Sequence, residues 1–149
     1  MKIVLQRVAH GRVTVDGQET GSINNGYLLF LGVSEEDTKE IAEKMVDKIS
    51  KLRIFEDENG KINQSLYQVS GEILVVSQFT LYADCRKGNR PSFTKAGSPK
   101  KANILYDFVI EQFKSKGYHV EHGRFGADMK VELINDGPFT LVLDSHELF

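Results

Sequence analysis

The sequence predicts an α+β fold in which a mostly antiparallel or mixed β-sheet is combined with two main α-helices. Short apolar runs, several of them preceded or followed by Asp-Gly or Asn-Gly turns, indicate many strands, and two segments carry apolar residues at helical spacing. The strand and helix signals do not alternate regularly, which argues against a doubly wound parallel sheet. A chain of 149 residues has the size of one ordinary domain, so we expect a single domain over residues 1–149.

The N-terminal part of the chain carries the first strand signals. Apolar residues alternate loosely over residues 3–8 and cleanly over residues 13–15, before the Asp-Gly pair at 16–17. The Asn-Gly pair at 25–26 is a second turn signal, and it leads into an apolar run over residues 27–33. An apolar run without alternation is typical of a strand that is buried on both faces.

The first helix is expected to begin after Asp37, the candidate N-cap, with Glu40 three residues on in capping-box spacing. Its apolar face is formed by Ile41, Met45, Ile49 and Leu52. A short strand follows over residues 53–56 and ends at the Asn-Gly turn at 59–60. Gly71 is expected to start the strand that leads to Ser77.

The second half of the chain is expected to contain a loop, a helix and three strands. Residues 84–97 have no periodicity and several helix breakers, which predicts a loop. The second helix should begin near Pro99, with Gly117 just beyond its C-terminus and an apolar stripe made of Leu105, Phe108, Val109 and Phe113. The three closing strands are predicted near residues 118–121, 130–134 and 139–143.

The composition restricts the class of protein. Nineteen basic and 21 acidic residues give a formal net charge of −2, so global charge does not indicate a nucleic-acid-binding protein. The single cysteine, Cys85, cannot form an internal disulfide, and the N-terminus lacks a secretory signal, so we expect a cytoplasmic protein. The longest apolar run, residues 27–31, is too short to span a bilayer.

Two short segments carry most of the functional information. Residues 77–84, Ser-Gln-Phe-Thr-Leu-Tyr-Ala-Asp, directly follow the apolar run 73–76, and residues 135–140, Asn-Asp-Gly-Pro-Phe-Thr, directly precede the apolar run 141–143. Each segment places polar or turn-forming residues beside a strand of the core. This arrangement is typical of a site mounted at strand ends on a rigid scaffold.

These two segments resemble the SQxxL and NxGPxT motifs of the D-aminoacyl-tRNA deacylase family. Residues 1–8, 90–93 and 124–129 are similar to that family as well, so the resemblance extends over nearly the whole chain. It implies a deacylase-type fold with a barrel-like sheet. It also implies a cytoplasmic homodimer with active sites at the subunit interface that hydrolyses D-aminoacyl-tRNA and glycyl-tRNA, including glycine mischarged on tRNA for alanine. No metal or organic cofactor is implied.

In this family, the first motif carries the reaction. The matching residues here are Ser77, Gln78, Phe79 and Thr80. The resemblance implies that the backbone amides around Phe79 and Thr80 face the ester carbonyl, that side chains take little part, and that the 2′-hydroxyl of the terminal ribose assists. Without the resemblance, the simpler interpretation of the motif is a strand end whose hydroxyl caps a turn. A nucleophilic Ser or Thr would need a neighbouring base, and no His lies nearby in sequence.

The second motif contains Gly137 and Pro138, which taken alone would form a tight turn between two strands. The resemblance implies a cis Gly-Pro bond that enters the partner subunit's active site. There its carbonyl oxygens occupy the space that an L-side chain would need, so glycine escapes the filter. Arg7, Asn135 and Thr140 would support this element. Arg7 alone would more often be an edge or interface charge that pairs with a carboxylate.

Two further groups complete the expected site. The terminal adenosine is expected near the substrate-binding residues Leu81, Phe125, Gly126, Ala127 and Met129, although core packing is the default role for Phe and Met. The segment 86–101 contains no acidic residue, and we expect it to contact tRNA through Arg86, Lys87, Arg90 and Lys95. A solvated basic loop is the simpler interpretation of these residues, and Phe93 within it could stack on a base or anchor the loop.

Two other functions remain compatible with the sequence. The first is a non-catalytic nucleic-acid-binding module that uses the basic loop 86–101, although no aromatic-rich strand motif accompanies it. The second is a hydrolase of small esters with Thr80 as its nucleophile. A metal site at His119 and His122 is not expected, because an offset of three puts them on opposite faces of a strand.

Overall fold

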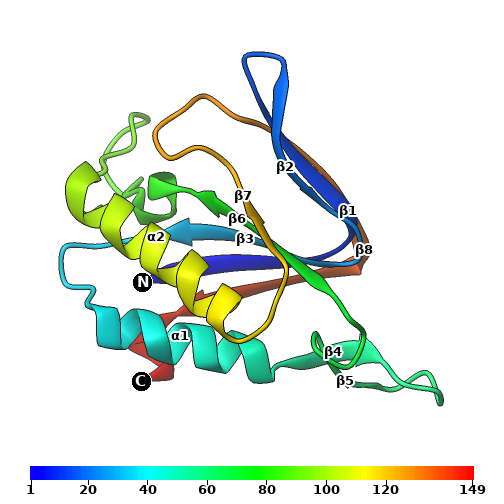
Figure 1. Cartoon of the computed structure of the whole chain (residues 1–149). Coiled ribbons are helices and arrows are strands. Elements are labelled where there is room, and N and C mark those ends of the chain that lie inside the picture. Colours follow the sequence, from blue (N-terminus) through cyan, green and yellow to red (C-terminus); the bar gives the residue numbers. More distant parts are fainter.

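The computed structural model describes all 149 residues and contains a six-stranded mixed sheet, a separate two-stranded sheet and two main helices (Figure 1). This arrangement confirms the predicted α+β class. The strands of the large sheet are β1 (Lys2–Val15), β2 (Gln18–Ile23), β3 (Gly26–Gly32), β6 (Glu72–Ser77), β7 (Val120–His122) and β8 (Lys130–Asp144). The small sheet consists of β4 (Arg53–Glu56) and β5 (Ile62–Ser65). The helices are α1 (Lys39–Lys51), α2 (Pro99–Ser115), the short α3 (Ser145–Leu148) and the 3-10 turn η1 (Phe79–Tyr82).

The long strand β1 pairs with three others. Along one edge it pairs with β8 over almost its whole length, and along the other edge its first half pairs with β3 and its second half with β2. Because β3 and β2 leave the same edge one after the other, the sheet curls towards closure. Gly21 of β2 lies so close to β7 that a Cβ at this position would be 2.8 Å from the carbonyl oxygen of His122. The sheet is therefore nearly closed and barrel-like, as expected.

The centre of the sheet is parallel and fully buried. β3 runs parallel to β6, and β6 parallel to β7. Leu28, Leu29, Ile73, Leu74 and Val75 have no exposed surface. Strands covered on both faces carry continuous apolar runs instead of alternation. This explains why the run at 27–33 is apolar throughout.

The two main helices lie together against one face of the sheet (Figure 1). Their buried stripes contribute Met45 and Ile49 from α1, and Leu105, Val109 and Phe113 from α2, to the principal core. A smaller apolar cluster inside the curled sheet is built from Val8, Val13, Ile23, Leu28, Leu74 and Val76. None of the helices combines the length and apolar character that a membrane span requires.

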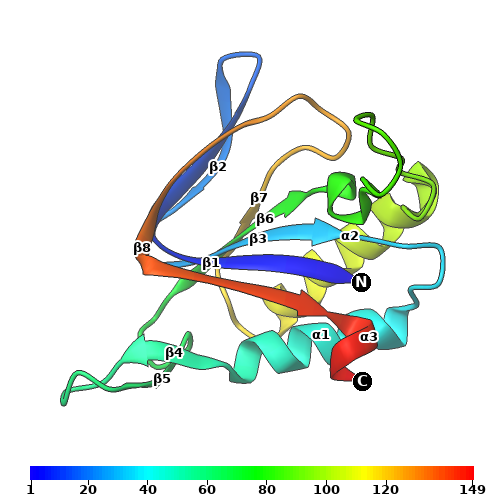
Figure 2. The ribbon, with the colours of Figure 1, turned by 180° about the vertical axis from the view of Figure 1, so that it is seen from behind.

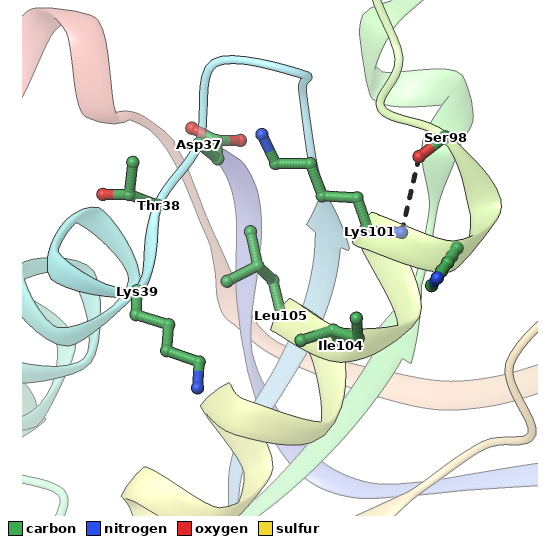
Figure 3. Close-up of a pocket in the computed structure, with 8 residues that line it drawn as sticks. Asp37, Thr38, Lys39, Ser98, Lys101, Ile104 and Leu105 are labelled. Carbon is green, nitrogen blue, oxygen red and sulfur yellow. Dashed lines mark hydrogen bonds between the residues drawn. The ribbon is translucent and has the colours of Figure 1, made fainter.

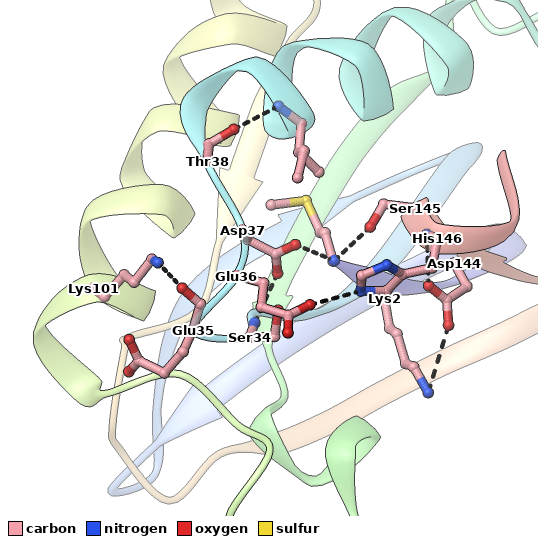
Figure 4. A network of polar contacts seen from close by, with 12 residues as sticks. Lys2, Ser34, Glu35, Glu36, Asp37, Thr38, Lys101, Asp144, Ser145 and His146 are labelled. Atoms are coloured by element: carbon pink, nitrogen blue, oxygen red, sulfur yellow. Dashed lines mark hydrogen bonds and ion pairs between the residues drawn. The ribbon is translucent and has the colours of Figure 1, made fainter. Parts of the chain in front are cut away.

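The predicted N-cap of the first helix is wrong, whereas the predicted start and end of the second helix are confirmed. Thr38, and not Asp37, is the N-cap of α1, and its side chain accepts the N–H of Ile41 at 3.3 Å. The Asp37 carboxylate turns inward instead, where it accepts the N–H of Ser34 at 2.7 Å and pairs with the Met1 ammonium group (Figure 4). α2 begins at Pro99 behind the N-cap Ser98, and Gly117, with φ 90°, follows the last turn.

The C-terminal strands also differ from the prediction. The two strands expected at 130–134 and 139–143 form one strand, β8, and Gly137-Pro138 lies within it and not in a turn between two strands. Irregularities in register against β1, on both sides of Val8, absorb the extra residues. Figure 2 shows β8 changing direction sharply midway. Likewise, the segments 3–8 and 13–15 belong to the single strand β1, and η1, α3 and β5 were not predicted.

Gly26 provides a test of the parallel pairing. A Cβ at this position would lie 1.9 Å from the carbonyl oxygen of Glu72, which is backbone and cannot move aside. We expect Gly26→Ala to lower the free energy of unfolding by about 3 kcal/mol, measured by guanidinium chloride titration. Gly11→Ala is the matched control, because its Cβ would meet side chains at an ordinary 3.4 Å, and we expect it to change stability by less than about 1 kcal/mol. Equal stability losses would show that β3 and β6 are not packed as described.

Candidate active site

The first motif lies where β6 ends. The buried residues Ile73–Val76 carry the chain to Ser77, and the N–H of Gln78 donates to the carbonyl of Leu31 at 2.8 Å, which ties the strand end to β3. The 3-10 turn η1 then begins at Phe79. Bonds from Leu81 N–H to Gln78 O (3.3 Å) and from Ala83 N–H to Thr80 O (3.0 Å) hold it. The first N–H groups of such a turn, those of Phe79 and Thr80, have no partner inside it.

This strand end opens onto a cleft of about 720 Å³. Two expected groups, far apart in sequence, come together there: Ser77, Gln78 and Phe79 on one side, and Phe125, Gly126, Ala127 and Met129 on the other. Thr80 and Leu81 belong to η1 but do not line the cleft, and the Thr80 hydroxyl accepts a hydrogen bond from the Gln78 amide. No imidazole contacts that hydroxyl, so the structure offers Thr80 no base.

Other lining residues could not be identified from the sequence. The apolar floor comes from Leu31, Val33 and Val76. The segment that leads into α2 and the first turn of the helix add Ala96, Gly97, Ser98, Pro99 and Ala102. Only the packing of α2 against the strand ends brings these residues together. The ring of Phe93 meets that of Phe79 edge-on at a centroid distance of 5.1 Å at the cleft. This contact favours loop anchoring as the role of Phe93.

The buried Tyr106 connects several of the elements that surround the cleft. Tyr106 on α2 donates its hydroxyl to the carbonyl of Val75 at 3.0 Å, and its ring contacts that of Phe125 at 5.8 Å. Burial raises the pKa of the Tyr106 phenol, so the group is a neutral donor at physiological pH. Tyr106 thereby links α2 to β6 and to the segment that carries Phe125.

The Gly137-Pro138 element is exposed and lies elsewhere. Its peptide bond is cis, as the resemblance implied, and Gly137 has φ 141°. Asp136, Gly137 and Pro138 are all exposed, and none of them lines the cleft of its own chain. The bend of β8 lies at the opposite end of the molecule from η1 and the start of α2 (Figures 1 and 2).

Arg7 and Asn135 hold this element. Arg7 is only 7% exposed and pairs with no carboxylate. Its guanidinium donates to the carbonyls of Asp136 (3.0 Å) and Ile54 (2.6 Å) and lies over the ring of Phe139 at 4.8 Å. The Asn135 side chain accepts the N–H of Phe139 (3.1 Å) and donates to the carbonyls of Phe139 (2.9 Å) and Arg7 (3.1 Å). Thr140 makes a weaker contact, accepting from the Gln6 amide at 3.2 Å.

The basic loop divides into paired and free cations. Asp84, the first residue of the loop 84–97, binds the Arg86 guanidinium at 2.5 Å, and this contact lowers the pKa of the Asp84 carboxyl well below its ordinary value. Arg86 is therefore partly neutralised. Lys87, Arg90 and Lys95 are exposed and form no ion pair. They are the cations that remain available to an anionic partner.

A second cavity, of about 370 Å³, lies between the N-terminal ends of α1 and α2 (Figure 3). Asp37, Lys39, Lys101 and Leu105 are among its lining residues. Ser98 lines both this cavity and the cleft, so the two share a wall. None of the expected site residues lies in it.

Comparisons with known proteins agree with this geometry. The family model described as D-Tyr-tRNA(Tyr) deacylase matches residues 4–144. The chain is 52% identical to the D-aminoacyl-tRNA deacylase of Thermotoga petrophila and 53% identical to that of Clostridioides difficile, over 149 residues and the full length of both chains in each case.

Solved structures show the same fold. One, titled c-Myc DNA Unwinding Element Binding Protein, has a TM-score of 0.90 at 44% identity and covers 97% of this chain and 98% of its own. Another, of a probable eukaryotic D-amino acid tRNA deacylase, has a TM-score of 0.81 at 21% identity, with coverage of 95% and 97%, and supports the fold alone. The family match and the full-length relatives show that this chain belongs to the D-Tyr-tRNA(Tyr) deacylase family, whose members are hydrolases of aminoacyl-tRNA esters.

Proposed function

We propose that this deacylase cleaves the ester between a D-amino acid, or glycine, and the terminal ribose of tRNA, and that the whole chain, residues 1–149, acts as one catalytic domain. The observation that carries the proposal is the cleft. It brings the end of β6 and the first turn of η1 together with the apolar segment 125–129. An apolar slot beside backbone donors suits an adenosine that carries an activated ester. Such a reaction removes misacylated tRNA and belongs to translation proofreading.

The backbone of η1 supplies the catalytic donors in this proposal. Water attacks the carbonyl carbon, negative charge develops on the carbonyl oxygen, and the ester bond breaks to release the free amino acid and the ribose hydroxyl. Phe79 lines the cleft and Thr80 follows it directly in η1, at the edge of the cleft. The N–H groups of these two residues, which have no partner inside the turn, would donate to that oxygen. Removing one oxyanion donor from an enzyme typically costs about 2.7–4 kcal/mol of transition-state stabilisation. An aminoacyl ester is already reactive, so positioning, these donors and the ribose 2′-hydroxyl suffice without a side-chain nucleophile.

Chirality is proposed to be read by a second copy of the chain. Gly137 and Pro138 are exposed and remote from the cleft of their own chain. In a two-fold homodimer each chain can offer its element to the other's cleft. The Gly137 and Pro138 carbonyls would then occupy the space that an L-side chain requires, whereas a D-side chain points elsewhere and glycine has none. Rigid backbone rejects the wrong enantiomer by steric clash.

Arg7 is proposed to fix the position of this filter. Its guanidinium joins Asp136 of β8 to Ile54 of β4 through two carbonyls, and Asn135 closes the other side of the element. A planar guanidinium can bridge two acceptors in fixed directions, whereas an ammonium group cannot. The buried charge is therefore used for geometry and not for an ion pair.

Lys87, Arg90 and Lys95 are proposed to contact tRNA phosphates beside the cleft, with Arg86 in a lesser role. Phosphate contacts require local positive charge and not a basic protein as a whole. The cytoplasm, where tRNA is aminoacylated, is the proposed location. The rival function, a nucleic-acid-binding module without catalysis, uses the same loop, so activity assays and not binding assays distinguish the two.

The chirality proposal is tested with purified wild-type protein. We expect D-tyrosyl-tRNA, D-aspartyl-tRNA and glycyl-tRNA to be deacylated while L-tyrosyl-tRNA survives, because only an L-side chain meets the filter. The measurement is release of labelled amino acid against a control without enzyme. Hydrolysis of the L-ester at the rate of the D-ester would disprove the filter, and binding without hydrolysis of any ester would favour the rival module.

A substitution at Arg7 tests how the filter is held. Arg7→Lys keeps the charge but loses the bridge between the two carbonyls, so we expect the ratio of kcat/KM for D- over L-tyrosyl-tRNA to fall by about tenfold or more. Arg12→Lys on the same strand is the control, because Arg12 is exposed and pairs only with Glu132. An unchanged ratio in Arg7→Lys would show that Arg7 is not needed to hold the element.

The basic loop is tested by charge removal. Combined Lys87→Ala, Arg90→Ala and Lys95→Ala should weaken tRNA binding without changing the D/L ratio, because phosphates carry no information about the amino acid. The slope of log Kobs against log salt should fall in magnitude by about 2–3, as expected for three lost phosphate contacts. Arg86→Ala should have a smaller effect, since Asp84 already binds that cation. Removing Lys48, Lys51 and Lys61 is the control, and an equal loss there would contradict a specific role for the loop.

A further inference from the structure

A buried ion pair lies beneath the active-site end of the molecule and has no part in the mechanism above. The Met1 ammonium group pairs with Asp37 and also donates to the Ser145 hydroxyl at 2.7 Å (Figure 4). Met1 is 0%, Asp37 1% and Ser145 4% exposed. A buried charge is tolerated only when it is paired and hydrogen-bonded, so each partner requires the other.

The second carboxylate oxygen of Asp37 holds the segment that follows β3. It accepts the N–H of Ser34 at 2.7 Å, while the Asp37 N–H donates to Ser34 O at 3.3 Å. Ser34 forms a β-bridge with Ala96, and the N–H of Gly97 donates to Val33 O at 2.8 Å. A Cβ at Gly97 would lie 3.1 Å from the Ser34 backbone, which shows how closely the two segments pack.

A second connection leaves the same segment through Glu35. The Glu35 carboxylate accepts the N–H of Ser98. The Glu35 backbone carbonyl accepts from the Lys101 ammonium group (Figure 4). Asp37 and Ser98 also face one another across the small cavity between the two helix ends (Figure 3). The wall formed by Ala96, Gly97 and Ser98, which lines the cleft, is therefore held at three successive positions by residues 33–35.

We propose that Asp37 is a positioning residue for deacylation. Anchored by the Met1 ammonium group, Asp37 fixes Ser34 within the segment 33–35. This segment in turn fixes the wall at residues 96–98, against which the substrate lies. This inference rests on the proposed function, because the wall matters only if the cleft binds the aminoacyl end of tRNA. Asp37 touches no substrate and acts only through Ser34 and Glu35.

The first test compares two destabilising substitutions. Asp37→Asn leaves the Met1 ammonium group without a counter-charge, and Ile49→Ala opens a cavity in α1 away from the cleft. Both should lower the melting temperature. With rates expressed per folded molecule, well below both melting temperatures, we expect kcat on D-tyrosyl-tRNA to fall about tenfold or more in Asp37→Asn and to stay within about twofold of wild type in Ile49→Ala. Equal kcat values in the two variants would overturn the proposal.

If Asp37→Asn does not fold, a second pair of variants tests the proposed positioning of the cleft wall. Glu35 and Glu36 are adjacent and exposed, but only Glu35 contacts the cleft wall, whereas Glu36 faces His146. We expect Glu35→Ala to keep the wild-type melting temperature and to lower kcat by about threefold or more, with Glu36→Ala unchanged. Identical kinetics in these two variants would overturn the proposal.

The proposed function and the positioning role of Asp37 can be refuted separately. A wild-type protein that does not deacylate D-tyrosyl-tRNA would refute the proposed function alone. The positional claim would then be judged from amide ¹H–¹⁵N spectra of the same variants. We expect the Ala96 and Gly97 resonances to shift in Asp37→Asn and Glu35→Ala but not in Ile49→Ala or Glu36→Ala. Unmoved resonances would refute the positional claim alone.

Discussion

The pairing of β1 on both edges is the constraint on which the rest of the structure depends. The strand is antiparallel to β8 on one side and to β3 and then β2 on the other, so it joins every antiparallel part of the large sheet. Because β3 and β2 follow one another along the same edge, the sheet must curl. The curl brings β2 onto β7 and places the C-terminal end of β6 at an open end of the sheet, where the first turn of η1 is accessible.

The same strand carries the residue that organises β8. Arg7 lies where the register between β1 and β8 slips. Its guanidinium donates to the carbonyl of Asp136, which the interrupted β1–β8 pairing leaves without a strand partner. Arg7 also donates to the buried carbonyl of Ile54, and a buried carbonyl without a donor is destabilising, as is a buried guanidinium without acceptors. Each satisfies the other. The outcome is a rigid, exposed Gly137-Pro138 element on a strand that is otherwise regular.

Rigidity at the cleft has a similar origin, since the candidate site is built mainly from backbone. Its proposed donors are N–H groups at the start of a 3-10 turn, and its wall is held through main-chain bonds of Ala96, Gly97 and Ser98. Backbone groups cannot change rotamer, which suits a site that must distinguish mirror images. The buried pair of Met1 and Asp37 adds to this rigidity. Asp37 binds both the Met1 ammonium group and the N–H of Ser34, which belongs to the segment that contacts the cleft wall.

The residues alone determined the α+β class, the two helices, the buried parallel strands and the two motifs, because hydrophobic periodicity and turn chemistry are local properties. They also placed Ser77, Gln78 and Phe79 at a strand end and identified Phe125–Met129 as their partner through the family resemblance.

Tertiary structure decided what depends on partners far along the chain. Asp37 has the sequence context of an N-cap, yet it turns inward because Met1 and Ser34 offer it a buried charge and a donor. Gly137 and Pro138 would form a turn by local rules, but β1 pairs on both sides of them and keeps β8 continuous. Thr80, Leu81 and Arg86 were assigned by motif or charge, whereas only the fold shows that the first two are not among the residues that line the cleft and that Asp84 already binds the third. Long-range pairing sets these outcomes, and no local pattern encodes which distant residue will be the partner.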